Sequence, residues 1–146
     1  MYYAEVSGRL NCLSVPVDLE TLLRTADFVS LHAPLTDTTR HIINTQTLAW
    51  MKPTAFFINT ARGPLIDETA LVEAVRANKI AGAAIDVFPI EPPPADHPFL
   101  HEKRSMVTPL AAWYSEQAKY EVRYKGAEEV VRVLTGQKPR TPVNNH

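Results

Sequence analysis

Apolar segments of this chain alternate with segments whose apolar residues recur at helical spacing. The apolar segments predict four buried strands, at residues 27–32, 54–59, 80–87 and 105–108, each followed by a loop. This alternation is typical of a parallel sheet with crossover helices packed on its faces. Ligands of such sheets bind in the loops at the carboxyl ends of the strands. We therefore expect an α/β fold whose functional residues lie in these four loops.

Helix boundaries are indicated by capping residues. Asp67 is the expected N-cap of a helix at 68–77, and Asn78 can take the left-handed conformation at its end. Ser115 is the expected N-cap of a long helix that ends before Gly136. An apolar stripe on this long helix predicts a core contact or a subunit interface: Ala118, Val122, Ala127, Val130, Val131 and Leu134.

Composition favours one globular domain. The 146 residues are 45% hydrophobic and 21% charged, with a net charge of −1, so no field attracts nucleic acid or an anionic membrane. The single cysteine, Cys12, cannot form an intrachain disulfide, and no apolar run reaches the roughly 20 residues of a membrane span. We expect a cytoplasmic protein without a nucleic-acid or membrane partner. No His and Cys cluster has metal-binding spacing, so no metal site is expected.

Four sequence blocks follow one another in a characteristic order, at residues 26–36, 59–67, 83–92 and 108–117. Together they resemble the NAD-binding domain of the D-2-hydroxyacid dehydrogenase family, and within it the C-terminal binding protein corepressors and their enzyme relatives. The resemblance runs from Val17 to Asn144. It implies a Rossmann-type sheet and, in complete relatives, hydride transfer between NAD and a small 2-oxo or 2-hydroxy acid, with NADP not excluded. A homodimer is a further expectation from the family.

The resemblance is to the later part of such a domain. No two of the five glycines are two residues apart, so the Gly-x-Gly-x-x-Gly turn that receives the pyrophosphate is not in this sequence. Residues 1–4 are expected to match the family's second strand. Residues 1–146 are thus expected to form a partial NAD-binding domain that lacks the first strand and the glycine-rich turn, with the substrate domain absent.

The family's catalytic roles map onto Arg62 and Glu91. Arg62 would hold the substrate carboxylate in its planar fork of donors, and its alternative is a salt bridge from loop to helix. Glu91 would hydrogen-bond a catalytic histidine, and its alternative is an ordinary loop carboxylate. Leu110 stands where the family has that histidine, in the pattern Thr-Pro-His. Because leucine transfers no proton, weak or no turnover is expected.

Without that histidine, the alternative function is a non-catalytic, corepressor-like binding or dimerisation module. His97 and His101 follow Glu91 in a proline-rich loop that we expect to be stiff. Either histidine could reach the site in principle, but beside prolines both are expected to be solvated.

The resemblance also implies the cofactor contacts. Asp86 would accept a hydrogen bond from the nicotinamide carboxamide, and its alternative is a helix cap or a satisfied turn carboxylate. The other implied contacts are Ala33, Pro34 and Leu35 on the adenosine side, and Thr60, Ala61 and Arg62 beneath the nicotinamide ribose.

Overall fold

The computed structural model describes residues 15–142, which fall into two compact units. The first unit ends at Ala112 and the second starts at Trp113. The strand expected at residues 1–4 lies outside the described residues. Within residues 15–142, no helix is both long and apolar enough to cross a membrane.

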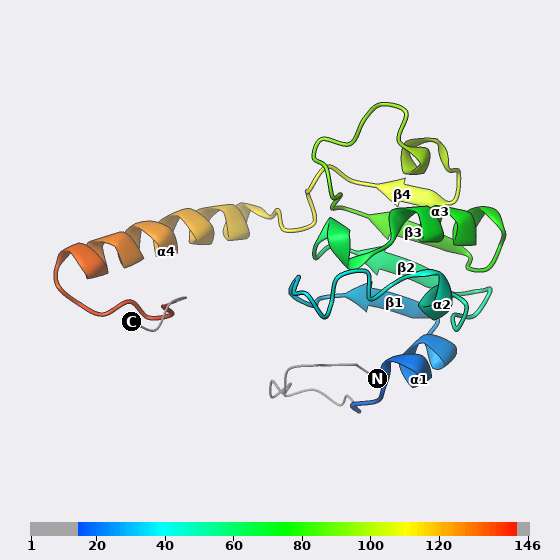
Figure 1. Cartoon of the computed structure of the whole chain (residues 1–146). Coiled ribbons are helices and arrows are strands. Elements are labelled where there is room, and N and C mark those ends of the chain that lie inside the picture. The colour runs from blue at the N-terminus through cyan, green and yellow to red at the C-terminus, as the bar shows by residue number, and fades with distance from the viewer. Residues whose placement is uncertain (1–14, 143–146) are drawn as a thin grey trace. The chain divides into compact units, whose positions relative to one another are not determined.

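The first unit is built on a four-stranded parallel sheet (Figure 1). Its strands follow the chain in order, and all adjacent pairs are parallel: β1 (Phe28–Leu31), β2 (Phe56–Asn59), β3 (Gly82–Ile85) and β4 (Ser105–Val107). The four predicted strands are confirmed, and each is shorter than its apolar segment. Ile80 and Val87 show why: both are buried, yet both lie outside the ladder, because burial also occurs in the connecting turns.

Helices connect the strands. They are α1 (Leu19–Thr25), α2 (Thr45–Leu48) and α3 (Glu68–Arg76), with short 3₁₀ helices η1 (Gly63–Leu65) and η2 (Pro98–His101). Asp67 caps α3 by accepting the Ala70 N–H at 3.1 Å, and Asn78 has φ 56°, both as predicted. Helices α1 and α2 are not predicted from the sequence, because each is too short for a clear apolar period. η2 makes part of the expected proline-rich loop helical.

The two faces of the sheet differ in how far other residues bury them. Strand register aligns Val29 with Phe57 and Ala83, and these three residues belong to the buried core together with apolar residues of α1, α2 and α3. The opposite face carries Phe28 and Phe56, whose rings stack at 5.7 Å and whose surfaces are 70% and 44% exposed. Because parallel sheets are normally covered on both faces, this is an unusual apolar surface within the first unit.

The second unit contains one long helix, α4 (Glu116–Leu134). Ser115 caps it by accepting the Ala118 N–H at 3.0 Å, and Gly136 follows its end with φ 78°, which confirms both predicted boundaries. No residue of α4 is buried, so the apolar stripe makes no core contact within the second unit, and its role in a subunit interface stays a prediction. A helical period shows that one side is apolar, but it does not show what covers that side.

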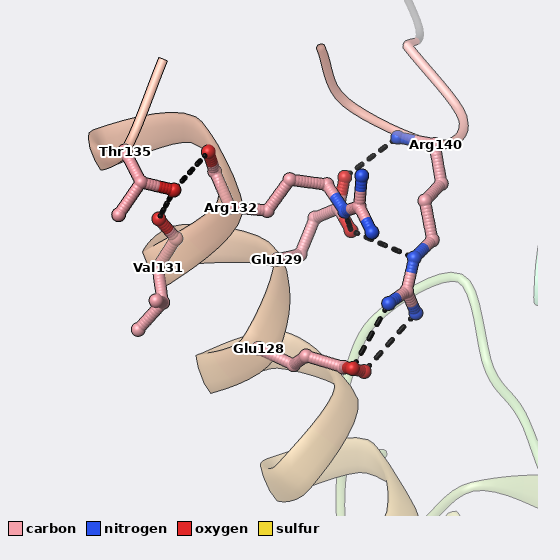
Figure 2. A network of polar contacts seen from close by, with 6 residues as sticks. All are labelled: Glu128, Glu129, Val131, Arg132, Thr135 and Arg140. Carbon is pink, nitrogen blue, oxygen red and sulfur yellow. Dashed lines mark hydrogen bonds and ion pairs between the residues drawn. The ribbon is translucent and has the colours of Figure 1, made fainter. Parts of the chain in front are cut away.

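Ion pairs join α4 to the segment that follows it (Figure 2). The Arg140 guanidinium lies 2.9 Å from Glu128, and the Arg140 N–H donates to Glu129 at 2.7 Å. The hydrogen bond and charge of Arg140 lower the pKa of Glu128. Surface ion pairs of this kind each contribute little to stability. We therefore infer that the network orders the segment after α4 more than it stabilises the helix.

Candidate functional site

The carboxyl ends of β1 and β2 border an open groove of about 580 Å³. Leu31 and Asn59 are register partners at the ends of these strands, so the two following loops start side by side. The groove is lined by His32, Ala33, Pro34, Leu35, Ala61 and Arg62. Five of these residues are ones that the sequence predicted to contact a cofactor, whereas Thr60 and Asp86 do not line the groove. The groove walls contain two side chains that can donate hydrogen bonds and no carboxylate.

Asn59 shapes the loop that carries Arg62. It is fully buried, its Nδ2 donates to the Arg62 carbonyl at 2.9 Å, and its Oδ1 accepts the Ala61 N–H at 3.0 Å. A buried amide needs such partners, and here both belong to the loop. No role for Asn59 is predicted from the sequence. The signal that could have indicated one is a polar residue at the end of an otherwise apolar strand.

Arg62 is an exposed residue. Its Nη1 donates to the adjacent Ala61 carbonyl at 2.6 Å. Among residues 15–142, no carboxylate lies within ion-pair distance of Arg62. The described part of the chain therefore does not show the salt bridge from loop to helix that was the alternative role of Arg62. A guanidinium without a carboxylate partner can receive one from a ligand.

Gly63 brings the Arg62 loop against the loop after β3. A Cβ atom at this position would lie 2.2 Å from the Phe88 carbonyl carbon and 2.3 Å from the Pro89 nitrogen. No side chain fits at these distances, so the close approach of the two backbones requires glycine. Glu91 lies in the same loop as Phe88, and its Oε1 accepts the Phe88 N–H at 2.9 Å. This bond is consistent with the alternative of a loop carboxylate, and the role of Glu91 beside a histidine stays a prediction.

Asp86 holds the loop after β4. The carboxylate is 5% exposed and accepts from the Thr108 hydroxyl, from the Ala111 N–H at 2.8 Å and from the Ala112 N–H at 3.0 Å. Burial alone would raise the pKa of Asp86, but these three hydrogen bonds outweigh it and lower the pKa. These bonds are consistent with the alternative of a satisfied turn carboxylate, and the cofactor contact of Asp86 stays a prediction. The carboxylate retains acceptor capacity, because its two oxygens can accept about four hydrogen bonds.

Leu110 lies in the loop that Asp86 holds, in an unfavourable backbone conformation. Its φ is 52°, and its N–H donates to the Asp86 carbonyl at 3.0 Å. The left-handed region costs a branched residue about 1–2 kcal/mol, whereas histidine and asparagine occur there more often. The side chain is 46% exposed, so packing gives leucine little compensation. The backbone of this position suits histidine better than the leucine that occupies it.

His97 is not the solvated histidine that the proline-rich sequence suggested, and that expectation is wrong. Its side chain is 13% exposed, and its ring lies between Phe88 at 5.0 Å and Phe99 at 5.7 Å. Nδ1 accepts the Phe99 N–H at 3.3 Å, and Nε2 lies 3.4 Å from Glu68. Burial raises the pKa of Glu68, and the nearby His97 opposes that rise. The two phenylalanine rings that contact this ring, nine and two residues away in sequence, could not be recognised as its neighbours from the run of prolines.

The remaining histidine of that loop, His101, is exposed, and its Nε2 lies 3.0 Å from the Ala95 carbonyl. A second hollow, of about 240 Å³, lies between α3 and His97 and is separate from the groove. In the described part of the chain, no three His, Cys, Asp or Glu side chains are placed to hold a metal ion.

Comparison with known proteins places this geometry in a family. The family described as D-isomer specific 2-hydroxyacid dehydrogenase, NAD binding domain, matches residues 3–112. The glyoxylate reductase of Thermofilum pendens is 44% identical over 127 residues, which are 87% of this chain and 38% of that enzyme. The chain thus spans well under half the length of this curated relative.

Two solved structures share the fold. The D-isomer specific 2-hydroxyacid dehydrogenase from Lactobacillus delbrueckii ssp. bulgaricus, in its NAD complexed form, has a TM-score of 0.80 at 30% identity, over 88% of this chain and 43% of that one. The enzyme from Xanthobacter autotrophicus Py2, in complex with NADPH and MES, has a TM-score of 0.82 at 31% identity, over 97% and 59%.

The family match includes every strand of the first unit and all the loops that border the groove. The expected Rossmann-type sheet and the expected family are both confirmed. The chain belongs to the D-isomer specific 2-hydroxyacid dehydrogenase family and carries sequence of its NAD-binding domain.

Proposed function

We propose that the groove at the ends of β1 and β2 is part of a nicotinamide dinucleotide site for oxidation or reduction of small 2-hydroxy and 2-oxo acids. The observation that carries the proposal is the lining of the groove, where Ala33, Pro34 and Leu35 provide an apolar wall and Arg62 a cation. An apolar wall suits the rings of a nucleotide, and donors without carboxylates suit its anionic groups. The bound dinucleotide would supply hydride transfer. NAD and NADPH each occur in a related structure, so NADP stays possible here.

Arg62 would bind the carboxylate of the 2-oxo acid. Its exposed guanidinium has no carboxylate partner among residues 15–142, and Asn59 fixes the backbone from which it projects. A bidentate pair would orient the substrate and draw electron density from the neighbouring carbonyl. Asp86, with its lowered pKa, stays ionised at neutral pH and would accept the carboxamide of the nicotinamide through its remaining acceptor capacity.

Turnover by this chain would be weak or absent, because Leu110 provides no proton to the substrate oxygen. Loss of a general acid–base group typically lowers a rate by about 10²–10⁴. Glu91 does not replace it, since its carboxylate accepts the Phe88 N–H and the histidine it would orient is missing. His97 does not replace it either, since both of its ring nitrogens are directed to Phe99 and Glu68.

A second candidate function is a non-catalytic binding or dimerisation module. The favouring observation is the apolar sheet face, where Phe28 and Met106 are 70% and 68% exposed. A homodimer that covers this face would remove the apolar area from water. Analytical ultracentrifugation of the chain and of Phe28→Ser tests it: a wild-type dimer that the substitution dissociates supports this function, and a monomeric wild type excludes the homodimer. We place either function in the cytoplasm, in line with the single cysteine.

Titration of NADH fluorescence tests the leading proposal. We expect weak, saturable binding to the wild-type chain, further weakened by Arg62→Ala and unchanged by Arg104→Ala, a cation remote from the groove. Absence of saturable binding would contradict the dinucleotide site. Tight binding with measurable glyoxylate reduction would contradict the weak turnover.

A further inference from the structure

We propose that His32 is a second anion-binding residue of the groove, a role that rests on the proposed function of that groove. His32 is the first residue after β1, and it lines the groove together with Arg62. The catalytic roles that the family resemblance implies fall on Arg62, Glu91 and the position of Leu110, so His32 is not among them. Its position at the strand end nevertheless puts an exposed imidazole where ligands of parallel sheets bind.

Ser30 restrains the His32 ring. The Ser30 hydroxyl lies 2.9 Å from His32 Nε2, within hydrogen-bond distance. If the hydroxyl donates to Nε2, the proton of a neutral ring resides on Nδ1, because one imidazole nitrogen accepts and the other donates. The ring then offers an N–H donor to a ligand without having to become charged. A ligand oxygen at Nδ1 would stabilise this same arrangement of the pair.

The composition of the groove wall determines the class of ligand. His32 and Arg62 both donate, the other lining residues are apolar, and no lining residue is a carboxylate. Such a wall favours anionic oxygens and disfavours cations. Its volume of about 580 Å³ lies in the range of sites for small organic molecules. Two sources share this chemistry: a nucleotide phosphate and the carboxylate of a 2-oxo acid.

NMR titration of the histidine ring signals tests the proposal on the purified chain. AMP is the phosphate probe, and oxamate is the carboxylate probe. The variants are His32→Gln, which keeps a polar side chain, Ser30→Ala, which frees the ring, and Arg62→Lys. The matched control is His101→Gln, because His101 is also exposed but contacts the Ala95 carbonyl outside the groove.

We expect the His32 ring signals to move on addition of one probe, which identifies the source of the anion. His32→Gln should weaken binding of that probe about 3- to 10-fold, the effect of an exposed hydrogen bond to a charged group. Ser30→Ala should weaken it about 2- to 5-fold, because the ring must be ordered on binding. His101→Gln should leave the affinity unchanged.

The other outcomes separate the two proposals. If Arg62→Lys weakens binding of the probe and His32→Gln does not, the role of His32 is overturned. The proposed dinucleotide site is not affected by that result. An equal loss of affinity in His32→Gln and His101→Gln also overturns it, since the effect would not be specific to the groove. Absence of binding by either probe overturns both proposals.

Discussion

Replacement of Asn59 by leucine should destabilise the first unit by about 2–3 kcal/mol. The side chain is fully buried and makes two hydrogen bonds, to the Arg62 carbonyl at 2.9 Å and from the Ala61 N–H at 3.0 Å. Leucine has a similar size and makes neither bond. Each partner left unsatisfied costs about 1–3 kcal/mol, and the better burial of an apolar side chain offsets part of the sum.

Urea denaturation followed by circular dichroism measures this loss. The matched control is Gln46→Leu, because Gln46 is an exposed amide on α2, and its substitution should change the free energy of unfolding by less than about 0.5 kcal/mol. Amide hydrogen exchange at Ala61 should also accelerate in Asn59→Leu, since its acceptor is removed. A loss below about 0.5 kcal/mol in Asn59→Leu would refute the inference that this side chain holds the Arg62 loop.

Three further substitutions have definite expected outcomes in the same assay. Gly63→Ala should cost about 3 kcal/mol or more, because its Cβ would meet Phe88 at 2.2 Å, whereas Gly126→Ala, with open space around it, should not destabilise. Leu110→Asn should stabilise by about 0.5–1 kcal/mol by relieving the left-handed strain, and Leu100→Asn, at similar exposure without positive φ, should not. Asp86→Asn should cost about 2 kcal/mol at neutral pH. The pKa of Asp86 is lowered in the folded protein, so its carboxylate stabilises the fold above the unfolded pKa of about 4. This stabilisation is lost as the pH falls through the folded pKa. The free energies of unfolding of wild type and Asp86→Asn should therefore converge in acid. The Gly63 prediction fails if Gly126→Ala lowers the free energy of unfolding as much as Gly63→Ala does. The Leu110 prediction fails if Leu110→Asn lowers this free energy. The Asp86 prediction fails if the difference between wild type and Asp86→Asn does not change with pH.

The features that the sequence predicted correctly depend on local chemistry. Strands β1 to β4 follow from apolar segments, and the N-caps Asp67 and Ser115 follow from a side-chain oxygen placed before a helical period. The order of four sequence blocks indicates Ala33 to Leu35 and Ala61 to Arg62 as cofactor contacts; these residues line one groove, and their contact with a cofactor stays a prediction. These signals need no knowledge of which segments meet in space.

The features that the sequence did not predict depend on how the loops fold. His97 is buried by Phe88 and Phe99, and nothing in a run of prolines indicates that these rings would enclose it. The role of Asn59 follows from its burial and from backbone groups of its own loop, which residue type alone does not reveal. The left-handed φ of Leu110 likewise results from the hydrogen bonds that Asp86 makes to the neighbouring residues.

We propose that this chain contributes to a dinucleotide site whose proton-donor position is occupied by Leu110. The most direct test joins the chain to the first strand, glycine-rich turn and substrate domain of an active relative and compares the rate of glyoxylate reduction with and without Leu110→His. NADH and glyoxylate binding are measured in both proteins. We predict that Leu110→His raises kcat about 10²-fold or more, because a proton donor is restored where the family has its histidine. If kcat is unchanged while NADH and glyoxylate both bind, Leu110 does not occupy the proton-donor position.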